Sequence, residues 1–161
     1  HVMAKSTPAT LALQKAKLAF ELHTYVYDPD ADRVGMAAAE ALSVPPARML
    51  KTLIAQVDGK PVCAVIRSDR ELSLKKLAQT FGGKHAQMQA PAEAERLTGY
   101  HVGGISPLGQ RRRLPTVLDA DALNHPTVYL NGGQRGLQIE IDPALLRSAL
   151  AAEVRDVLAD G

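Results

Sequence analysis

The sequence predicts an α+β fold: a single compact domain in which helices flank a mixed, mostly antiparallel sheet. Three observations lead to this prediction. Short runs of strand-forming residues alternate along the chain with capped, amphipathic segments typical of helices. Two apolar runs, 50–57 and 61–67, are joined by Asp58-Gly59, a strong signal for an antiparallel hairpin. The 161 residues, 46% of them hydrophobic, suffice for one domain with its own core.

The N-terminal part predicts helix, strand and helix in turn. Thr7 is a candidate N-cap and Pro8 suits the first helical position, so we expect a helix to about residue 19. The leucines that can share a face of it are Leu11, Leu18 and Leu22. Residues 22–27 are rich in strand formers and are ended by an Asp-Pro-Asp segment. An alanine-rich helix is expected over 36–42, before a pair of prolines.

After the hairpin, a helix is expected over 72–81, with Ser73 as its cap. Its predicted inner face consists of Leu74, Leu77, Ala78 and Phe81. A short helix over 92–97 follows. The remaining elements expected are strands at 115–118 and 127–130, a glycine-rich turn at 131–136, a half-buried strand at 137–141 and a helix over 142–151.

Composition excludes several classes of protein. With 19 Lys+Arg against 17 Asp+Glu, the net charge of +2 does not by itself indicate a nucleic-acid partner. Cys63 is the only cysteine, which excludes an intramolecular disulfide, and its apolar neighbours indicate a small buried hydrophobe. Because neither a membrane-length apolar run nor a signal peptide is visible, we expect a cytoplasmic protein without a membrane partner. We interpret residues 1–3 as a cloning remnant and 4–161 as the domain.

The most informative segment is the loop 103–110, which has three glycines and a proline and is followed by Arg111-Arg112-Arg113. Glycine allows positive φ and close backbone approach, so the loop could hold phosphate or a sugar–phosphate chain beside the arginines. A tight turn followed by solvated charges explains the segment equally well. No serine-hydrolase elbow, Walker loop or paired-cysteine motif occurs, and no two histidines have metal-ligand helical spacing.

Four segments in the same order, 23–25, 50–53, 98–109 and 132–137, resemble the YbaK family. This family consists of aminoacyl-tRNA deacylases related to the editing insertion of bacterial prolyl-tRNA synthetases. The resemblance implies the same α+β fold and an aminoacyl-tRNA substrate, with removal of cysteine from Cys-tRNA(Pro) as the expected activity. It implies no metal and no cofactor, and it allows a transient complex with prolyl-tRNA synthetase.

The resemblance also assigns residues. Lys51 matches the family's functional lysine, although an edge lysine that discourages strand pairing is the alternative. Gly103 is expected to act beside it through its backbone. The residues expected to contact the substrate are Tyr25, Val34, Gly104, Ile105, Ser106, Pro107, Asn131 and Gly132. Val34 and Asn131 depart from the family, where an aromatic and a serine occur. Tyr25 could instead pack on the core.

The densest positive charge predicts the RNA surface. Its expected members are Arg111, Arg112, Arg113, Lys75 and Lys76, with Lys84 nearby, and a solvated face is the alternative.

An aminoacyl ester is already activated, so orientation and oxyanion stabilisation could suffice without a protein nucleophile. Attack by the substrate's own thiol, as the family implies, and attack by water both stay open. So do another small acyl group such as alanine, a non-catalytic tRNA-binding module and a regulatory interaction domain.

Overall fold

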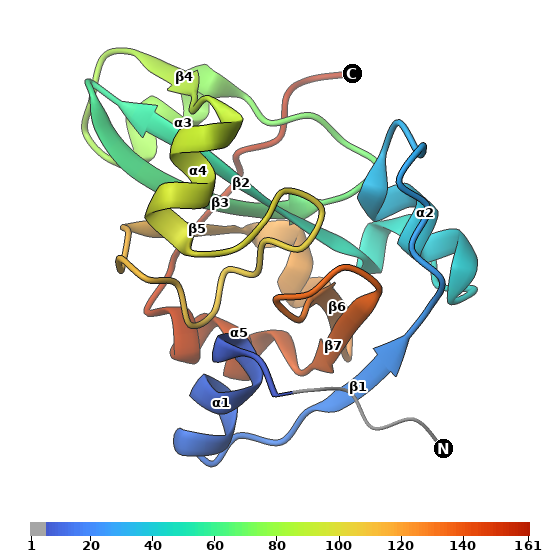
Figure 1. Ribbon diagram of the computed structural model, residues 1–161. Helices are drawn as coiled ribbons and strands as arrows, with labels where there is room; N and C mark the ends of the chain where they lie inside the picture. The colour runs from blue at the N-terminus through green and yellow to red at the C-terminus, as the bar shows by residue number, and fades with distance from the viewer. Residues whose placement is uncertain (1–5) are drawn as a thin grey trace.

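A computed structural model describes residues 6–161, so the expected remnant at residues 1–3 lies outside the described part (Figure 1). Within residues 6–161 the strands form two sheets. The smaller sheet has the order β1 (Glu21–Thr24), β7 (Leu137–Ile141) and β6 (Val128–Asn131). The larger has the order β4 (Ala86–Met88), β2 (Leu50–Val57), β3 (Lys60–Arg67), β5 (Thr116–Asp119) and β8 (Glu153–Arg155).

The helices pack around both sheets. They are α1 (Pro8–Lys15), α2 (Val34–Ala41), α3 (Leu74–Thr80), α4 (Pro91–Thr98) and α5 (Pro143–Leu150), with short 3₁₀ helices at Pro46–Arg48 and Ala120–Asn124. Strand pairs are antiparallel except β3–β5 and β5–β8, which are parallel. The predicted α+β class with a mixed, mostly antiparallel arrangement is therefore confirmed. No helix among residues 6–161 is long and apolar enough to span a bilayer.

The larger sheet is covered on both faces. Alternate residues of β3 enter two different cores: Cys63 and Val65 pack with α1, α4, α5 and the smaller sheet, whereas Ala64 and Ile66 pack with α3. This double burial explains why the strand reads as an uninterrupted apolar run. Burial raises the pKa of the Cys63 thiol to about 12, as expected for a small hydrophobe rather than a nucleophile. The helices α1 and α5 lie side by side and line one cavity together (Figure 1).

The sequence correctly predicted the turns and helix caps that depend on a few neighbouring residues. Asp58 and Gly59 both have positive φ, 49° and 81°, as the hairpin prediction requires. Thr7 caps α1 and Ser73 caps α3, each through its side-chain oxygen. Gly99 ends α4 in the left-handed conformation, at φ 81°.

Other predictions were wrong in extent. Helix α1 ends at Lys15, not at about residue 19, because the chain turns through a left-handed residue at Lys17. Consequently Leu22 lies in β1, Leu11 is 52% exposed, and Leu13 supplies the buried contact instead. The predicted inner residue Leu74 is 37% exposed, whereas Leu77 and Ala78 of the same helix are buried. The three-residue strands β4 and β8 carry too few residues to show a period.

Candidate functional site

A cavity of about 250 Å³ opens where the two sheets meet. Met49, just before β2, forms a bridge with Tyr129 of β6, and this contact joins the sheets beside the cavity. The wall comes from α2, the start of β2, the glycine loop and the facing ends of β6 and β7. Its residues are Val34, Gly35, Leu50, Lys51, Thr52, Val102, Gly103, Ile105, Asn131 and Gln138.

Lys51 supplies the positive charge of the cavity. The side chain is half-buried and forms no hydrogen bond or ion pair with the other described residues. Burial lowers its pKa; nearby Glu71 and Asp69 oppose that shift, and Arg33 adds to it. The ammonium group is therefore close to charges of both signs yet free to contact a ligand.

Buried polar atoms without partners gather at the same place. Among the described residues, Thr52 Oγ1 and Gln138 Oε1 find no hydrogen-bond partner, and the buried hydroxyl of Tyr25 has only the Gln138 side chain close to it. Gln138 is only 3% exposed, and it lies directly opposite Asn131 across β6 and β7. Leaving a buried polar group unpaired costs about 1–3 kcal/mol, so these atoms favour a ligand that supplies the missing bonds.

Thr52 and Gln138 were absent from the sequence-based site. The available signal was a polar residue inside an otherwise apolar strand. The alternation over 137–141 places Gln138 on the outward face together with Glu140. Gln138 and Glu140 do share a face of β7. At Gln138, however, the second sheet covers this face. Glutamine therefore lines the cavity while the glutamate lies nearer to solvent.

The two glycine-rich loops bind each other. Asn131 accepts hydrogen bonds from the backbone amides of Gly133 and Gln134, at 2.7 and 3.2 Å, and its Nδ2 donates to the carbonyl of Gly103 at 3.2 Å. Gly103 has φ +91°, and a Cβ there would lie 2.6 Å from the hydroxyl oxygen of Tyr27. Gly103 is therefore glycine for its backbone conformation and for its packing against tyrosine.

The structure brings only part of the predicted substrate site together. Val34, Lys51, Gly103, Ile105 and Asn131 line the cavity. Tyr25 lies behind it: burial raises the pKa of its hydroxyl, and nearby Gln138 opposes the shift. The predicted contacts that do not line the cavity are Gly104, Ser106, Pro107 and Gly132.

Three of these four make contacts that shape the loops, and the fourth, Pro107, lies elsewhere. Gly104 packs closely on the backbone of residues 134 and 135. Ser106 is fully buried, and its hydroxyl accepts a bond from the amide of Leu108. The carbonyl of Gly132 accepts a 2.6 Å hydrogen bond from Thr7. Pro107 lines a separate cavity.

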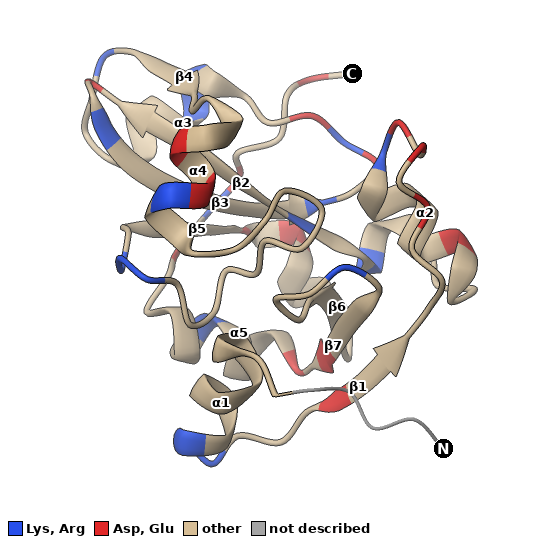
Figure 2. Ribbon diagram, viewed as in Figure 1, with Lys and Arg blue, Asp and Glu red and all other residues tan. Residues whose placement is uncertain are grey.

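The predicted RNA-contacting residues are divided between two places, and none of them lines the Lys51 cavity. The amides of Arg111 and Arg112 bind the last carbonyls of α4, so this basic segment is folded onto that helix. In Figure 2 the segment is the blue stretch at the left, whereas α2 lies at the right. On α3, Lys75 is exposed, and Lys76 binds Asp156 at 3.1 Å and the carbonyl of Leu158 at 2.7 Å.

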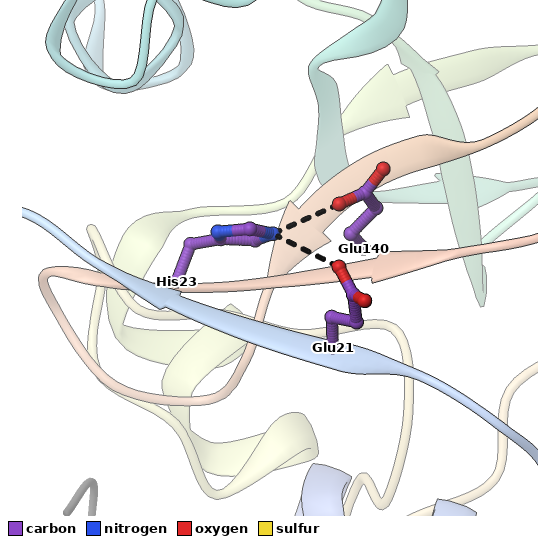
Figure 3. Close-up of side chains that lie close together, drawn as sticks. All are labelled: Glu21, His23 and Glu140. Atoms are coloured by element: carbon purple, nitrogen blue, oxygen red, sulfur yellow. Dashed lines mark hydrogen bonds and ion pairs between the residues drawn. The ribbon is translucent and has the colours of Figure 1, made fainter.

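A second cluster of titratable groups lies on β1 and β7 (Figure 3). His23 Nε2 is 2.9 Å from Glu140 Oε1 and 4.0 Å from Glu21 Oε2. These atoms are close enough together to hold a metal ion. However, Thr127 also donates to Glu140 at 2.6 Å, and Arg48 lies 3.8 Å from it. Glu21 and Glu140 are cross-strand partners, and the imidazole is hydrogen-bonded to Glu140 with Glu21 at the longer distance.

The fold and cavity define an α+β domain with a small cavity beside a lysine and two docked glycine loops. The sequence matches the aminoacyl-tRNA editing domain over residues 28–149. It is 32% identical over 155 residues to EbsC of Enterococcus faecalis, provisionally named a Cys-tRNA(Pro)/Cys-tRNA(Cys) deacylase. That match covers 95% of this chain and 93% of EbsC.

Two further relatives link the domain to proline-specific synthetases. A proline–tRNA ligase of Acidithiobacillus ferrooxidans is 34% identical over 124 residues, which are 75% of this chain but 22% of the ligase. A crystal structure described as a candidate trans-editing enzyme for prolyl tRNA synthetase has a TM-score of 0.80 and 27% identity, covering 98% of this chain and 100% of that one.

The chain therefore belongs to the aminoacyl-tRNA editing domain family. This confirms the resemblance found in the sequence, and with it the expected class of enzyme, an aminoacyl-tRNA deacylase.

Proposed function

We propose that this protein acts in trans to remove cysteine from mischarged Cys-tRNA(Pro). The observation that carries the proposal is the cavity itself, with the free ammonium of Lys51 beside the unpaired Thr52 and Gln138. At about 250 Å³ it is slightly smaller than the usual range for small-molecule sites, about 300–1,000 Å³. It suits one small aminoacyl group rather than a bulky one. The family membership and the deacylase named above support the same activity.

In this proposal the protein orients the ester and stabilises charge. The apolar walls formed by Val34, Leu50 and Ile105 limit access of water to the acyl group. Lys51 lies where it can stabilise the oxyanion that develops on the ester carbonyl. Gln138 Oε1 can accept a hydrogen bond from the substrate's α-ammonium group, a donor that every aminoacyl ester carries.

The substrate supplies the nucleophile. The thiolate of the cysteinyl group attacks its own carbonyl carbon, a carbon–sulfur bond forms, and the bond from that carbon to the ribose oxygen breaks. The ribose oxygen takes up a proton, which releases the tRNA and a cyclic thiolactone that water later opens. The one cysteine of the chain, Cys63, is buried and does not line the cavity, so it does not take this role.

The test compares release of amino acid from Cys-tRNA(Pro), Ala-tRNA(Pro) and S-methylcysteinyl-tRNA(Pro) by the purified protein, with Lys51→Ala as the inactive control. We expect rapid release of cysteine and, because neither other substrate has a free thiol, at least tenfold slower release from them. Equal rates for all three substrates would show that water, and not the substrate's thiol, attacks the ester. Release of alanine faster than cysteine would refute the cysteine assignment. Added prolyl-tRNA synthetase tests whether selectivity for tRNA(Pro) comes from a complex of the two proteins.

A further inference from the structure

Arg33 adjoins the wall of the Lys51 cavity in sequence, and its own side chain lines a neighbouring cavity formed by α2 and the residues that flank it. It is the residue before α2, so it directly precedes Val34 and Gly35 of the wall. Its side chain is 52% exposed, and one guanidinium nitrogen donates to the carbonyl of Ser68 at 3.1 Å. Its nearest carboxylate, on Glu71, is 3.9 Å away and is itself largely exposed. Much of this guanidinium group therefore faces solvent, and its charge is close enough to Lys51 to contribute to the lowered pKa of that lysine.

Arg135 stands at another wall, on the loop between β6 and β7. Its Nε and Nη2 donate to the carbonyl of Val102 at 3.0 and 2.8 Å, and Val102 lines the cavity. The guanidinium carbon lies 5.4 Å from the centre of the Tyr27 ring. One edge of the planar Arg135 guanidinium group is thus held in position, and its remaining N–H groups are free to bind a ligand.

Other arginines near the junction of the sheets are committed to protein partners. Arg67 forms two bonds with Asp69, at 2.6 and 2.8 Å, and a third with Asp121 at 3.3 Å. Arg48 binds the backbone and hydroxyl of Thr127 and lies near Glu140. Arg33 and Arg135 differ because each is exposed and adjoins a residue of the cavity wall.

We infer that the single-stranded 3′ end of the tRNA crosses the cavity between Arg33 and Arg135. The inference rests on the proposed function, since an ester bound at Lys51 must bring its ribose and neighbouring phosphates to the cavity opening. Arg135 and Tyr27 hold the terminal nucleotide by stacking and hydrogen bonding, the usual way in which proteins bind unpaired bases. Val102, which is 43% exposed, adds an apolar surface beside them. Arg33 neutralises a backbone phosphate.

Binding of uncharged, fluorescein-labelled tRNA(Pro), followed by anisotropy at several salt concentrations, tests this path. We expect Arg33→Ala with Arg135→Ala to weaken binding at least tenfold. The salt slope should fall by about 0.7 for each phosphate that the variant no longer neutralises, the value for single strands. The matched control, Arg147→Ala with Arg155→Ala at exposed positions that do not line the cavity, should change the affinity less than twofold. Arg112→Ala with Arg113→Ala tests the basic segment after α4 as the alternative RNA surface. Arg135→Lys, which keeps the charge but not the planar fork, should recover less than half of the binding free energy that Arg135→Ala removes.

The inference is overturned if the Arg112/Arg113 variant loses affinity and the Arg33/Arg135 variant does not. It is also overturned if the Arg33/Arg135 variant loses affinity only together with its thermal unfolding midpoint, while Arg135→Lys behaves as wild type. Because the tRNA is uncharged, the assay needs no deacylation. Binding that depends on both arginines in a protein that releases no amino acid would refute the proposed function and leave the tRNA path intact.

Discussion

The side chain of Asn131 donates a hydrogen bond to the carbonyl oxygen of Gly103, at 3.2 Å, and thereby joins the two glycine-rich loops. Its Oδ1 accepts two backbone amides of its own loop, so one side chain fixes both segments. Both residues line the cavity. The position of the Gly103 backbone beside Lys51 therefore depends on an amide that was assigned to substrate binding from the sequence.

Asn131→Ala should lower both stability and activity, because it leaves two amides and a carbonyl without their partner. We expect a loss of about 1–3 kcal/mol in the free energy of unfolding, measured by urea denaturation. Asn131→Asp keeps the acceptor for the amides but loses the donor to Gly103, so it should destabilise less while still impairing deacylation. Asn124→Ala, at an exposed asparagine, is the control. An Asn131→Asp variant with wild-type turnover would show that the link between the loops is dispensable.

Gly103→Ala carries two separable costs. The residue has φ +91°, which an alanine adopts at a cost of about 1 kcal/mol or more, and its Cβ would lie 2.6 Å from the Tyr27 hydroxyl. Tyr27→Phe removes only the second conflict. We therefore expect the double variant Gly103→Ala, Tyr27→Phe to unfold at a higher temperature than Gly103→Ala alone but below Tyr27→Phe. If the second substitution recovers nothing, the loss comes from backbone strain and from the remaining close contacts of the Cβ with Arg135 Nε and Tyr27 Cζ, at 3.2 and 3.3 Å.

We predict that Lys51 gives the activity an alkaline limit. Because burial lowers its pKa from the ordinary 10.5, the ammonium loses its proton at a lower pH than an exposed lysine does. If the charged form stabilises the oxyanion, kcat/KM corrected for spontaneous ester hydrolysis should fall as the pH rises through that lowered pKa. Lys51→Arg stays charged throughout and should lack this fall. If kcat/KM of Lys51→Arg falls with pH in the same way as that of the wild type, the fall belongs to the titration of another group.

The same shift predicts that removal of Lys51 leaves the fold intact. With a folded-state pKa below the unfolded value, this lysine adds stability only above about pH 10.5, and that contribution is lost as the pH falls through the folded-state pKa. At neutral pH the buried charge stabilises nothing. Lys51→Ala should therefore reduce deacylation about 100-fold, as loss of an oxyanion-stabilising group does, with less than about 1 kcal/mol of destabilisation. Lys60→Ala, in the exposed end of the hairpin, is the control.

The sequence predicts those features of the fold that depend on residues close together in the chain. The Asp58-Gly59 turn and the cap formed by Thr7 each depend on a few adjacent residues, and both appear as expected. The division of the strands into two sheets depends on pairings between distant segments, such as Met49 with Tyr129, and no local pattern records it. The three-residue strands have too few positions for a period, so they were missed.

The site was predictable to the extent that its motifs are distinctive. Lys51, Gly103 and Asn131 were assigned through the resemblance, and the fold brings them to one cavity. The assignment also included Gly104, Ser106, Pro107 and Gly132, which do not line the cavity, because a distinctive motif does not separate the residues of a cavity wall from the residues that shape the turn. Thr52 and Gln138 were missed for the opposite reason: alternation indicates which residues share a face, but not what covers that face.

Gln138 offers the sharpest test, because its buried Oε1 has no hydrogen-bond partner among the described residues. In the free protein this atom costs stability, so Gln138→Leu, similar in size and without a polar group, should raise the free energy of unfolding by about 1 kcal/mol. If Oε1 accepts a bond from the substrate's ammonium group, the same variant should deacylate at least tenfold more slowly. Higher stability together with lower activity is the pattern expected of a binding group.

Two variants separate this role from general packing. Gln138→Glu keeps an acceptor at the same position and should retain more activity than Gln138→Leu, because a carboxylate also attracts an ammonium group. Gln87→Leu, at an exposed position of β4, is the control for adding an apolar side chain to a strand and should leave deacylation unchanged. A Gln138→Leu protein that is less stable than wild type would mean that Oε1 is satisfied within the fold. One that is more stable and fully active would remove Gln138 from substrate binding.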